Sequence, residues 1–103
     1  MDVPEIDVHE LAQQLAAGAP VVDVREPDEY EEVRVPGVTL IPLGAVTERL
    51  AEFPTDRTVY LVCRSGGRSA QAVAFLREQE VDAVNVAGGT LAWIESGREV
   101  DHG

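Results

Sequence analysis

The amino-acid sequence predicts an α/β domain with a mostly parallel central sheet of about five strands, flanked by helices on both faces. Three observations predict this fold class. Short apolar runs typical of strands alternate with helical stretches along the whole chain. The longest run carries apolar side chains for both faces of a sheet, as strands of parallel sheets do. The 103 residues suffice for one hydrophobic core, so we expect a single domain over residues 1–103.

Five runs rich in β-branched and other apolar residues are expected to form the strands. In chain order they are residues 5–6, 21–24, 39–41, 58–62 and 84–86. The run at 58–62 is the strongest of them, so we expect it at the centre of the sheet. The run at 5–6 is short and is expected at an edge.

Five stretches between these runs are expected to be helical. The first is opened by Asp7 and Glu10 in a capping-box pattern and closed by Gly18. The others are expected at residues 27–30, 44–52, 69–79 and 91–95. Pro27 suits the first turn of the second helix, because it needs no backbone N–H there. Residues 101–103 are expected to form a frayed tail.

The composition of the chain excludes several classes of partner. Nineteen acidic residues against eight basic ones give a formal net charge of −11, and such a surface repels nucleic-acid phosphates and anionic lipid headgroups. No apolar run is long enough for a membrane span, and the start of the chain lacks the pattern of a signal peptide. We therefore expect a cytoplasmic protein that binds neither nucleic acid nor membrane. The single cysteine fits a reducing compartment.

The strongest candidate for chemistry is a loop after the run at 58–62, here called the cysteine loop. Its residues 63–69 read Cys-Arg-Ser-Gly-Gly-Arg-Ser. In an open α/β sheet, ligands bind beyond the carboxyl ends of strands, where this loop is expected. Two adjacent glycines let backbone N–H groups point inward as an anion-binding nest, and the next helix adds the free N–H groups of its first turn. Such surroundings lower the pKa of a thiol and make Cys63 a candidate nucleophile.

The charge around Cys63 contrasts with that of the rest of the chain. Residues 58–77 contain three arginines and no acidic residue. Arg64 and Arg68 flank the glycine pair, and they would favour both a thiolate and an anionic substrate. The alternative is that Cys63 is a small buried hydrophobe at the end of a strand. The glycine pair and the arginines favour the reactive thiol.

Four parts of the sequence resemble motifs of the rhodanese (thiosulfate sulfurtransferase) family. They are the cysteine loop, Asp23-Val24-Arg25-Glu26 with Glu29-Tyr30, Pro36-Gly37 with Ile41-Pro42-Leu43, and Gly88-Gly89 with Trp93. The resemblance covers most of the chain and implies the rhodanese-like fold and an enzyme of the thiosulfate sulfurtransferase type. One segment departs from the family pattern: residues 33–35 are Val-Arg-Val where the family usually has Gly-His-Ile. Arg34 is expected either near the pocket or in solvent.

The resemblance also implies a mechanism and a set of site residues. The Cys63 thiolate would take a sulfane sulfur from a small anionic donor such as thiosulfate, and the resulting persulfide would give it to a thiol, to cyanide or to a sulfur-carrier protein. The residues that would cradle donor and persulfide are Arg64, Ser65, Gly66, Gly67, Arg68 and Ser69. Asp23 and Arg25 would brace the cysteine loop, although a strand-end turn or cap is an equal alternative for Asp23. No ligands at metal spacing accompany Cys63, so we expect neither a metal nor another cofactor.

Two other functions compete with sulfur transfer. The first is a non-catalytic, regulatory rhodanese-type module that binds a partner protein, but such a module has no need of a reactive thiol in a complete cradle. The second is a cysteine-dependent phosphatase or arsenate reductase. The related phosphatases place five residues between cysteine and arginine, whereas four separate Cys63 from Arg68. The acidic residues within 26–32 are expected to form a solvated face, with docking of a basic partner as the alternative. Trp93 is expected in the core rather than as a wall of the active site.

Overall fold

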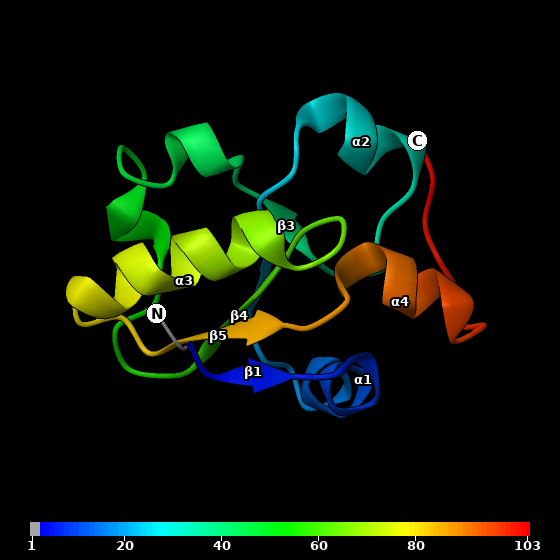
Figure 1. The fold of residues 1–103 in the computed structure, drawn as a ribbon, viewed down its shortest axis with the longest axis horizontal. Coiled ribbons are helices and arrows are strands. Elements are labelled where there is room, and N and C mark those ends of the chain that lie inside the picture. Colours follow the sequence, from blue (N-terminus) through cyan, green and yellow to red (C-terminus); the bar gives the residue numbers. More distant parts are fainter. Residues whose placement is uncertain (1–2) are drawn as a thin grey trace.

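The computed structural model describes residues 3–103, and its centre is a five-stranded sheet. The strands are β1 (Glu5–Ile6), β2 (Val21–Asp23), β3 (Thr39–Leu40), β4 (Val59–Val62) and β5 (Ala83–Val86). They lie in the order β1-β5-β4-β2-β3, and each neighbouring pair is parallel (Figure 1). The predicted α/β class is therefore confirmed, with β4 at the centre of the sheet and β1 at an edge.

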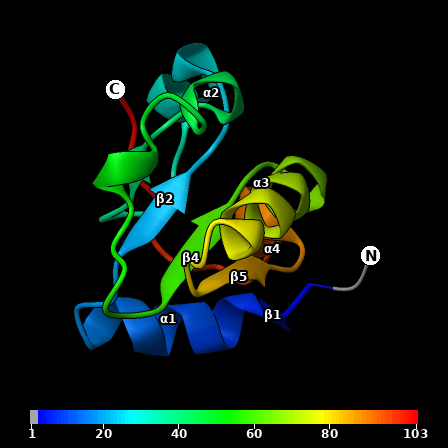
Figure 2. The same ribbon diagram turned by 90° about the vertical axis from the view of Figure 1, so that its left-hand side faces the viewer.

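Helices cover both faces of the sheet. They are α1 (Val8–Ala16), α2 (Pro27–Glu32), α3 (Gly67–Glu78) and α4 (Gly89–Glu95), together with two 3₁₀ turns, η1 (Leu43–Ala45) and η2 (Leu50–Glu52). One core joins the sheet to α3 and the 3₁₀ turns, and a second core joins it to α1 and α4. Figures 1 and 2 show α1 and α3 on opposite sides of the sheet. No helix within residues 3–103 is long and apolar enough to cross a membrane.

Strand β4 supplies side chains to both cores. Val59 and Leu61 lie in the core under α3, whereas Tyr60 and Val62 lie in the core with α1 and α4. This alternation follows from the two-residue period of a strand, and all four residues are buried because both faces of the sheet are covered. Cys63 continues the alternation and belongs to the α3 side. The position of Cys63 is thus set by β4, which has a neighbouring strand on each side.

The expected helix at residues 44–52 is wrong. The segment forms the two separate 3₁₀ turns η1 and η2. The N–H groups of Ala45 and Val46 donate to carbonyls three residues back, at 2.8 and 3.2 Å, which is the 3₁₀ pattern. Gly44 and the β-branched Val46 and Thr47 are weak helix formers, and Val46 is buried in the core with α3.

The expected frayed tail at residues 101–103 is also wrong. Asp101 and Arg34 form an antiparallel bridge with N···O distances of 3.0 Å in both directions. The N–H of Gly103 donates to the carbonyl of Glu31 at 2.7 Å. The guanidinium of Arg34 lies 4.6 Å from the centre of the Tyr30 ring and donates to the Tyr30 carbonyl. Arg34 therefore fastens the tail to α2, which neither expectation for this residue foresaw.

Trp93 packs into the core with α1, as expected. It is 6% exposed and belongs to the same core as Val8 and Leu11. Its indole N–H donates to the carbonyl of Glu99 at 2.8 Å, so the polar end of the ring is satisfied. The side chain anchors α4 against the sheet, and α4 in turn reaches the cysteine loop.

Candidate active site

Cys63 lies at the carboxyl end of the central strand. It follows β4 directly, and α3 begins at Gly67. The neighbouring strand β2 ends beside it, with Asp23 in register with Val62. The chain passes outward from β2 to β3 on one side of this point and from β4 to β5 on the other. Cys63 thus lies where the strand order reverses, the place at which parallel α/β sheets bind ligands.

Hydrogen-bond donors surround the sulfur of Cys63. The backbone N–H of Gly66 donates to Sγ at 3.1 Å, and the hydroxyl oxygen of Ser69 lies 3.3 Å from Sγ. Burial raises the pKa of this thiol, but hydrogen bonds to the thiolate from the Ser69 hydroxyl and from the N–H groups of Ser69, Gly66 and Ser65 lower it. The net result is a pKa below the ordinary value of a cysteine. The site therefore favours the nucleophilic form of the thiol.

Gly66 allows the cysteine loop to close around the sulfur. Its φ of 113° lies in the left-handed region, where a glycine carries no steric penalty. This turn starts α3 at Gly67 rather than at the expected Ser69. The free N–H groups of the first helical turn, including that of Ser69, therefore face the thiol and add the positive end of the helix dipole.

The N-terminus of α4 holds the cysteine loop from its other side. The N–H and the hydroxyl of Thr90 donate to the carbonyl of Cys63 at 2.8 and 2.9 Å. The N–H of Leu91 donates to the carbonyl of Arg64 at 3.0 Å. These bonds turn two carbonyls of the loop toward α4, which leaves the N–H groups free for the sulfur.

Arg68 is held by Glu29 of α2. Its guanidinium donates to both carboxylate oxygens, at 2.7 and 2.9 Å. The hydrogen bond from Arg68 lowers the pKa of Glu29 to about 2. The expectation of a solvated acidic face is therefore wrong for Glu29. Arg68 keeps its charge in this pair, and the Cys63 thiolate lies within its electrostatic reach.

Replacement of Glu29 by Gln is expected to remove a pH-dependent part of the stability. The pKa of Glu29 is about 2 in the folded chain against an ordinary value of 4.5. The pair therefore stabilises the fold fully above the ordinary value, and this contribution is lost as the pH falls through about 2. Because the two side chains are 36% and 27% exposed, screening reduces the expected loss at pH 7 to about 1 kcal/mol.

Urea unfolding of the wild type and of Glu29→Gln at several pH values measures this effect. The difference in the free energy of unfolding should narrow as the pH is lowered from 7 toward 2. A difference that stays constant over this range would contradict the role of the ion pair.

Asp23 and Arg25 bind each other at the end of β2. The Arg25 guanidinium makes three hydrogen bonds to the two carboxylate oxygens, and the Arg25 backbone N–H makes a fourth at 3.0 Å. Both residues are buried, and a further Arg25 hydrogen bond goes to the carbonyl of Val33 at 2.8 Å. Within residues 3–103, no hydrogen bond joins either side chain to the cysteine loop. The geometry is that of a charged strand-end turn beside the loop.

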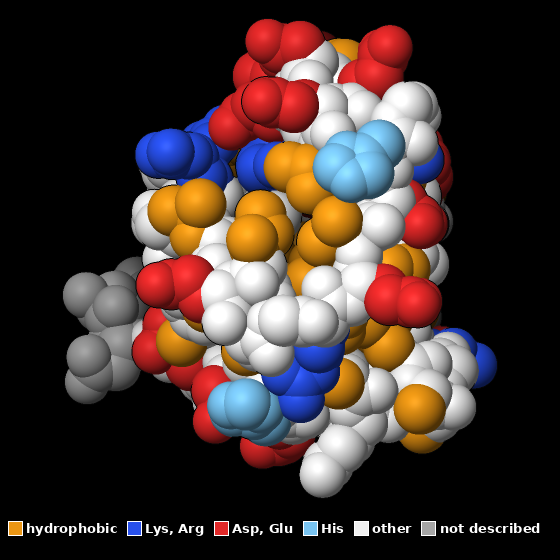
Figure 3. All heavy atoms as spheres, turned by 90° about the vertical axis from the view of Figure 1, so that its right-hand side faces the viewer, with side chains coloured by type: hydrophobic (Ala, Val, Ile, Leu, Met, Phe, Trp, Pro, Cys, Tyr) orange, Lys and Arg blue, Asp and Glu red, His pale blue; other side chains and the backbone are white. Residues whose placement is uncertain are grey.

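A hollow of about 230 Å³ opens next to the cysteine loop. Arg64 and Arg25 line it together with Leu91 and Ile94 of α4. Leu91 and Ile94 are the large apolar side chains that residues 3–103 leave exposed, at 39% and 42%. Figure 3 looks onto the side that carries α4: acidic atoms gather at its top, and patches of apolar atoms lie below them. Two carboxylates, Glu29 and Glu32, line it as well, so the hollow carries charges of both signs beside an apolar wall next to the cysteine loop.

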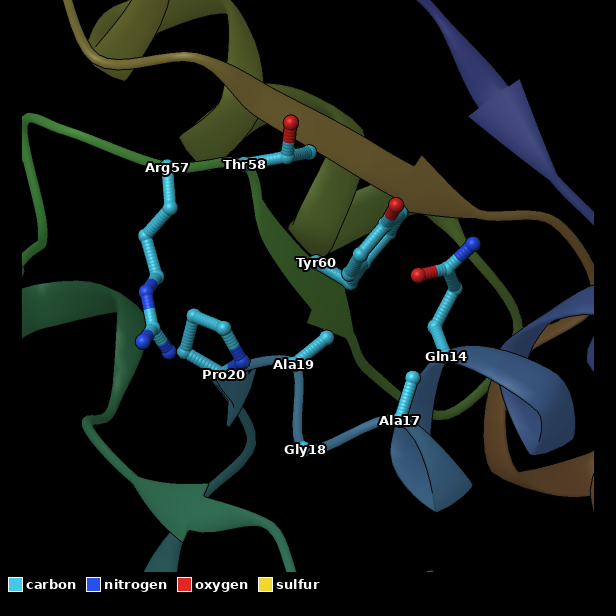
Figure 4. Close-up of a pocket in the computed structure, with 8 residues that line it drawn as sticks. All are labelled: Gln14, Ala17, Gly18, Ala19, Pro20, Arg57, Thr58 and Tyr60. Atoms are coloured by element: carbon cyan, nitrogen blue, oxygen red, sulfur yellow. The ribbon is translucent and has the colours of Figure 1, made fainter.

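A second hollow, of about 280 Å³, lies at the opposite end of the sheet (Figure 4). Tyr60 and Thr58 of the β4 region and Gln14 of α1 line it, with Arg57 at its rim. None of its lining residues carries a thiol, an imidazole or a carboxylate. Residues 3–103 also hold no cluster of three His, Cys, Asp or Glu side chains placed for a metal ion. Neither feature is a stronger candidate site than the cysteine loop.

Sequence reasoning missed three residues that contact the site: Glu29, Asn85 and Thr90. Glu29 was named within a family-like motif with Tyr30 and within an acidic run, but neither pattern gave it a contact with Arg68. Asn85 is a polar residue between two valines in β5, and its side chain contacts both Ser69 and the carbonyl of Gly66. A polar side chain within an apolar strand was the available signal for it. Thr90 directly follows Gly88-Gly89, but the resemblance in that segment named only the glycines and Trp93.

Known proteins resemble this chain in sequence and in structure. Residues 7–96 match the family model of the rhodanese-like domain. The chain is 41% identical over 98 residues to a sulfurtransferase of Allochromatium vinosum, covering 92% of each chain. It is 40% identical over 70 residues to the thiosulfate sulfurtransferase PspE of Escherichia coli, covering 66% of this chain and 67% of that protein. A rhodanese-related protein of Thermoplasma volcanium has a TM-score of 0.89 at 33% identity, over 95% of this chain and 97% of that one.

Proposed function

The chain belongs to the rhodanese-like domain family and is of the sulfurtransferase type, and we propose that it carries a sulfane sulfur as a persulfide on Cys63. The donor is thiosulfate or a related anion, and the acceptor is a thiophile. The observation that supports this most directly is the environment of the Cys63 sulfur. An N–H of the cysteine loop donates to Sγ at 3.1 Å, and the pKa of the thiol lies below its ordinary value.

In the first half-reaction, the Cys63 thiolate attacks the outer sulfur of thiosulfate. A bond forms between Sγ and that sulfur, the sulfur–sulfur bond of thiosulfate breaks, and its electron pair leaves with sulfite. No proton is transferred, so the step depends on how much of Cys63 is thiolate. The N–H of Gly66, 3.1 Å from Sγ, supports the negative charge before the attack.

In the second half-reaction, an acceptor thiolate or cyanide attacks the outer sulfur of the persulfide. The bond between that sulfur and Sγ breaks, and its electron pair returns to Sγ, which regenerates the thiolate. The cycle consumes no oxidant and needs no second thiol, in keeping with the single cysteine of this sequence.

Arg64 and Arg68 orient the anionic donor by different means. Arg64 is exposed, lines the hollow beside the loop, and has no carboxylate partner within residues 3–103. Arg68 is engaged by both oxygens of Glu29. We therefore assign the direct contact with the donor to Arg64, while Arg68 supplies a fixed positive field.

The exposed wall of α4 favours an acceptor that brings apolar surface. Leu91 and Ile94 lie on the same hollow as Arg64, and burial of exposed apolar side chains is the main driving force of protein association. A protein that presents a thiol, such as a sulfur carrier, satisfies this better than a small anion does. Cyanide serves as acceptor in an assay because it needs only the outer sulfur.

Incubation with thiosulfate is expected to load one sulfur atom onto the chain. Intact-mass spectrometry should show a gain of about 32 Da, the mass of one sulfur on the thiol oxidation ladder, and cyanide should remove it. Protein whose thiol has first been alkylated with iodoacetamide serves as the control and should gain nothing. An unchanged mass after treatment with thiosulfate and with an organic persulfide would contradict the proposed function.

A further inference from the structure

The hydroxyl of Ser69 has one proton and three neighbouring acceptors. Its oxygen lies 3.3 Å from Sγ of Cys63, 3.3 Å from the carbonyl of Gly66, and closest to Oδ1 of Asn85. Ser69 and Asn85 are 0% and 1% exposed, so water does not share these bonds. Only one of the three acceptors receives the proton at a time.

The orientation of the Asn85 carboxamide decides which acceptor is preferred. Its Nδ2 donates to a carboxylate oxygen of Glu5 at 2.8 Å and to the carbonyl of Gly66 at 3.2 Å. Both partners can only accept, so the nitrogen must face them and Oδ1 must face Ser69. The carboxamide therefore offers Ser69 an acceptor with a fixed position.

We propose that Asn85 is a positioning residue that acts on Cys63 through Ser69. Its Oδ1 accepts the hydrogen bond of the Ser69 hydroxyl while Cys63 carries no charge, and it competes with the sulfur for that hydrogen bond once Cys63 is a thiolate. When the hydroxyl turns to Sγ, the buried Oδ1 loses its closest donor, and an unsatisfied buried acceptor costs free energy. Asn85 thus sets how strongly Ser69 can stabilise the thiolate.

This arrangement matches the charge changes of a persulfide cycle, and in this respect it rests on the proposed function. In the free enzyme the negative charge is on Sγ, and the Ser69 hydroxyl is most useful there. In the persulfide the charge lies on the outer sulfur and Sγ is neutral. The Ser69 hydroxyl then donates its hydrogen bond to Asn85 again. The Ser69 hydroxyl thus donates to Sγ when Cys63 is charged, and it donates to Asn85 when Sγ is neutral.

Several charged groups face Cys63 or the groups bonded to it. They are Arg64 of the cysteine loop, Arg68 of α3 with its partner Glu29 of α2, the pair of Asp23 and Arg25 at the end of β2, and Glu5 of β1 behind Asn85. Substitution of Asn85 by an uncharged residue leaves all of them in place. Such a substitution also removes the Nδ2 donor to Glu5 and to the Gly66 carbonyl, so the part of the pKa change that passes through Ser69 is isolated by comparison with a Ser69→Ala background.

The test is the variant Asn85→Leu, which keeps the number and branching of the side-chain heavy atoms and removes the competing acceptor together with the Nδ2 donor. The Cys63 pKa should fall by about one unit, corresponding to the free energy of one hydrogen bond. The measurement is the rate of Cys63 alkylation by iodoacetamide as a function of pH, which reports the thiolate without any sulfur transfer. Thiosulfate loading of the same variant is measured separately, so a failure of the proposed function is recognised independently.

The variant Ser69→Ala provides the background that isolates the effect of Asn85 exerted through the Ser69 hydroxyl. In that background Asn85→Leu should leave the Cys63 pKa unchanged, because the hydroxyl through which Asn85 acts is gone. An unchanged or raised pKa in the single variant Asn85→Leu would overturn the proposal, and so would a shift of equal size in both backgrounds. Circular dichroism verifies that each variant folds, and Asn85→Ala replaces Asn85→Leu if the larger side chain does not fit.

Discussion

Replacement of Cys63 by Ser is expected to abolish sulfur loading and to lower sulfurtransferase activity by about a thousandfold or more, as removal of a catalytic nucleophile does. A hydroxyl in the same position stays protonated at neutral pH, whereas the Cys63 thiol ionises readily because its pKa lies below the ordinary value. Intact-mass spectrometry after thiosulfate treatment, together with sulfite release, provides the measurement.

The same prediction covers how the rate of sulfur loading in the wild type depends on pH. A lowered pKa keeps Cys63 ionised at pH values at which an ordinary cysteine is protonated. As the pH is lowered, the rate of the first half-reaction should therefore stay constant through the pH range in which an ordinary cysteine becomes protonated. It should then fall as the pH drops through the Cys63 pKa. Cys63→Ser is nearly isosteric, so circular dichroism should show an unchanged fold. Persistence of the 32 Da gain in this variant would assign the sulfur to another group.

Patterns that act over a few residues predicted the sheet well. The apolar run at β4 was recognised because both of its faces are covered, which leaves no polar position in Val59–Val62. The helix expected at residues 44–52 failed because its apolar spacing is used by two 3₁₀ turns instead. The tail failed because its partner, Arg34, is distant in sequence. Local periodicity carries no information about such a pairing.

The contrast between local patterns and distant pairings also explains which residues of the candidate site were predicted. Cys63, the glycines and Ser69 lie within one strand–loop–helix unit, whose geometry follows from its own sequence. Glu29, Thr90 and Asn85 are 39 residues from Arg68, 27 from Cys63 and 16 from Ser69, the residues that they contact. Their placement depends on the strand order and on how α2 and α4 dock against the loop. Sequence spacing alone does not determine either of these.

Replacement of Gly89 by Ala is expected to destabilise the protein strongly. Gly89 has a φ of 56°, and a Cβ there would lie 2.5 Å from the carbonyl oxygen of Cys63 and 2.7 Å from that of Arg64. Both are backbone atoms held by the first turn of α4. They cannot yield without moving the loop that surrounds the sulfur.

Gly97 offers a matched control for this substitution. Its φ of 80° is also left-handed, but a Cβ there would meet no atom within 4 Å. Gly97→Ala should therefore cost only the backbone strain of about 1 kcal/mol, whereas Gly89→Ala adds a steric clash and should cost about 3 kcal/mol or more. Urea unfolding measures the two free energies of unfolding.

The reactivity of Cys63 distinguishes a displaced loop from a general loss of stability. If α4 holds the loop carbonyls, Gly89→Ala should raise the Cys63 pKa toward its ordinary value, since the N–H groups that stabilise the thiolate move with the loop. Gly97→Ala should leave the pKa unchanged. Equal costs for both variants, with the wild-type pH dependence of alkylation retained in each, would show that α4 does not shape the surroundings of the thiolate. The hydrogen bonds from Thr90 and Leu91 to the loop would then stabilise the fold without tuning its cysteine.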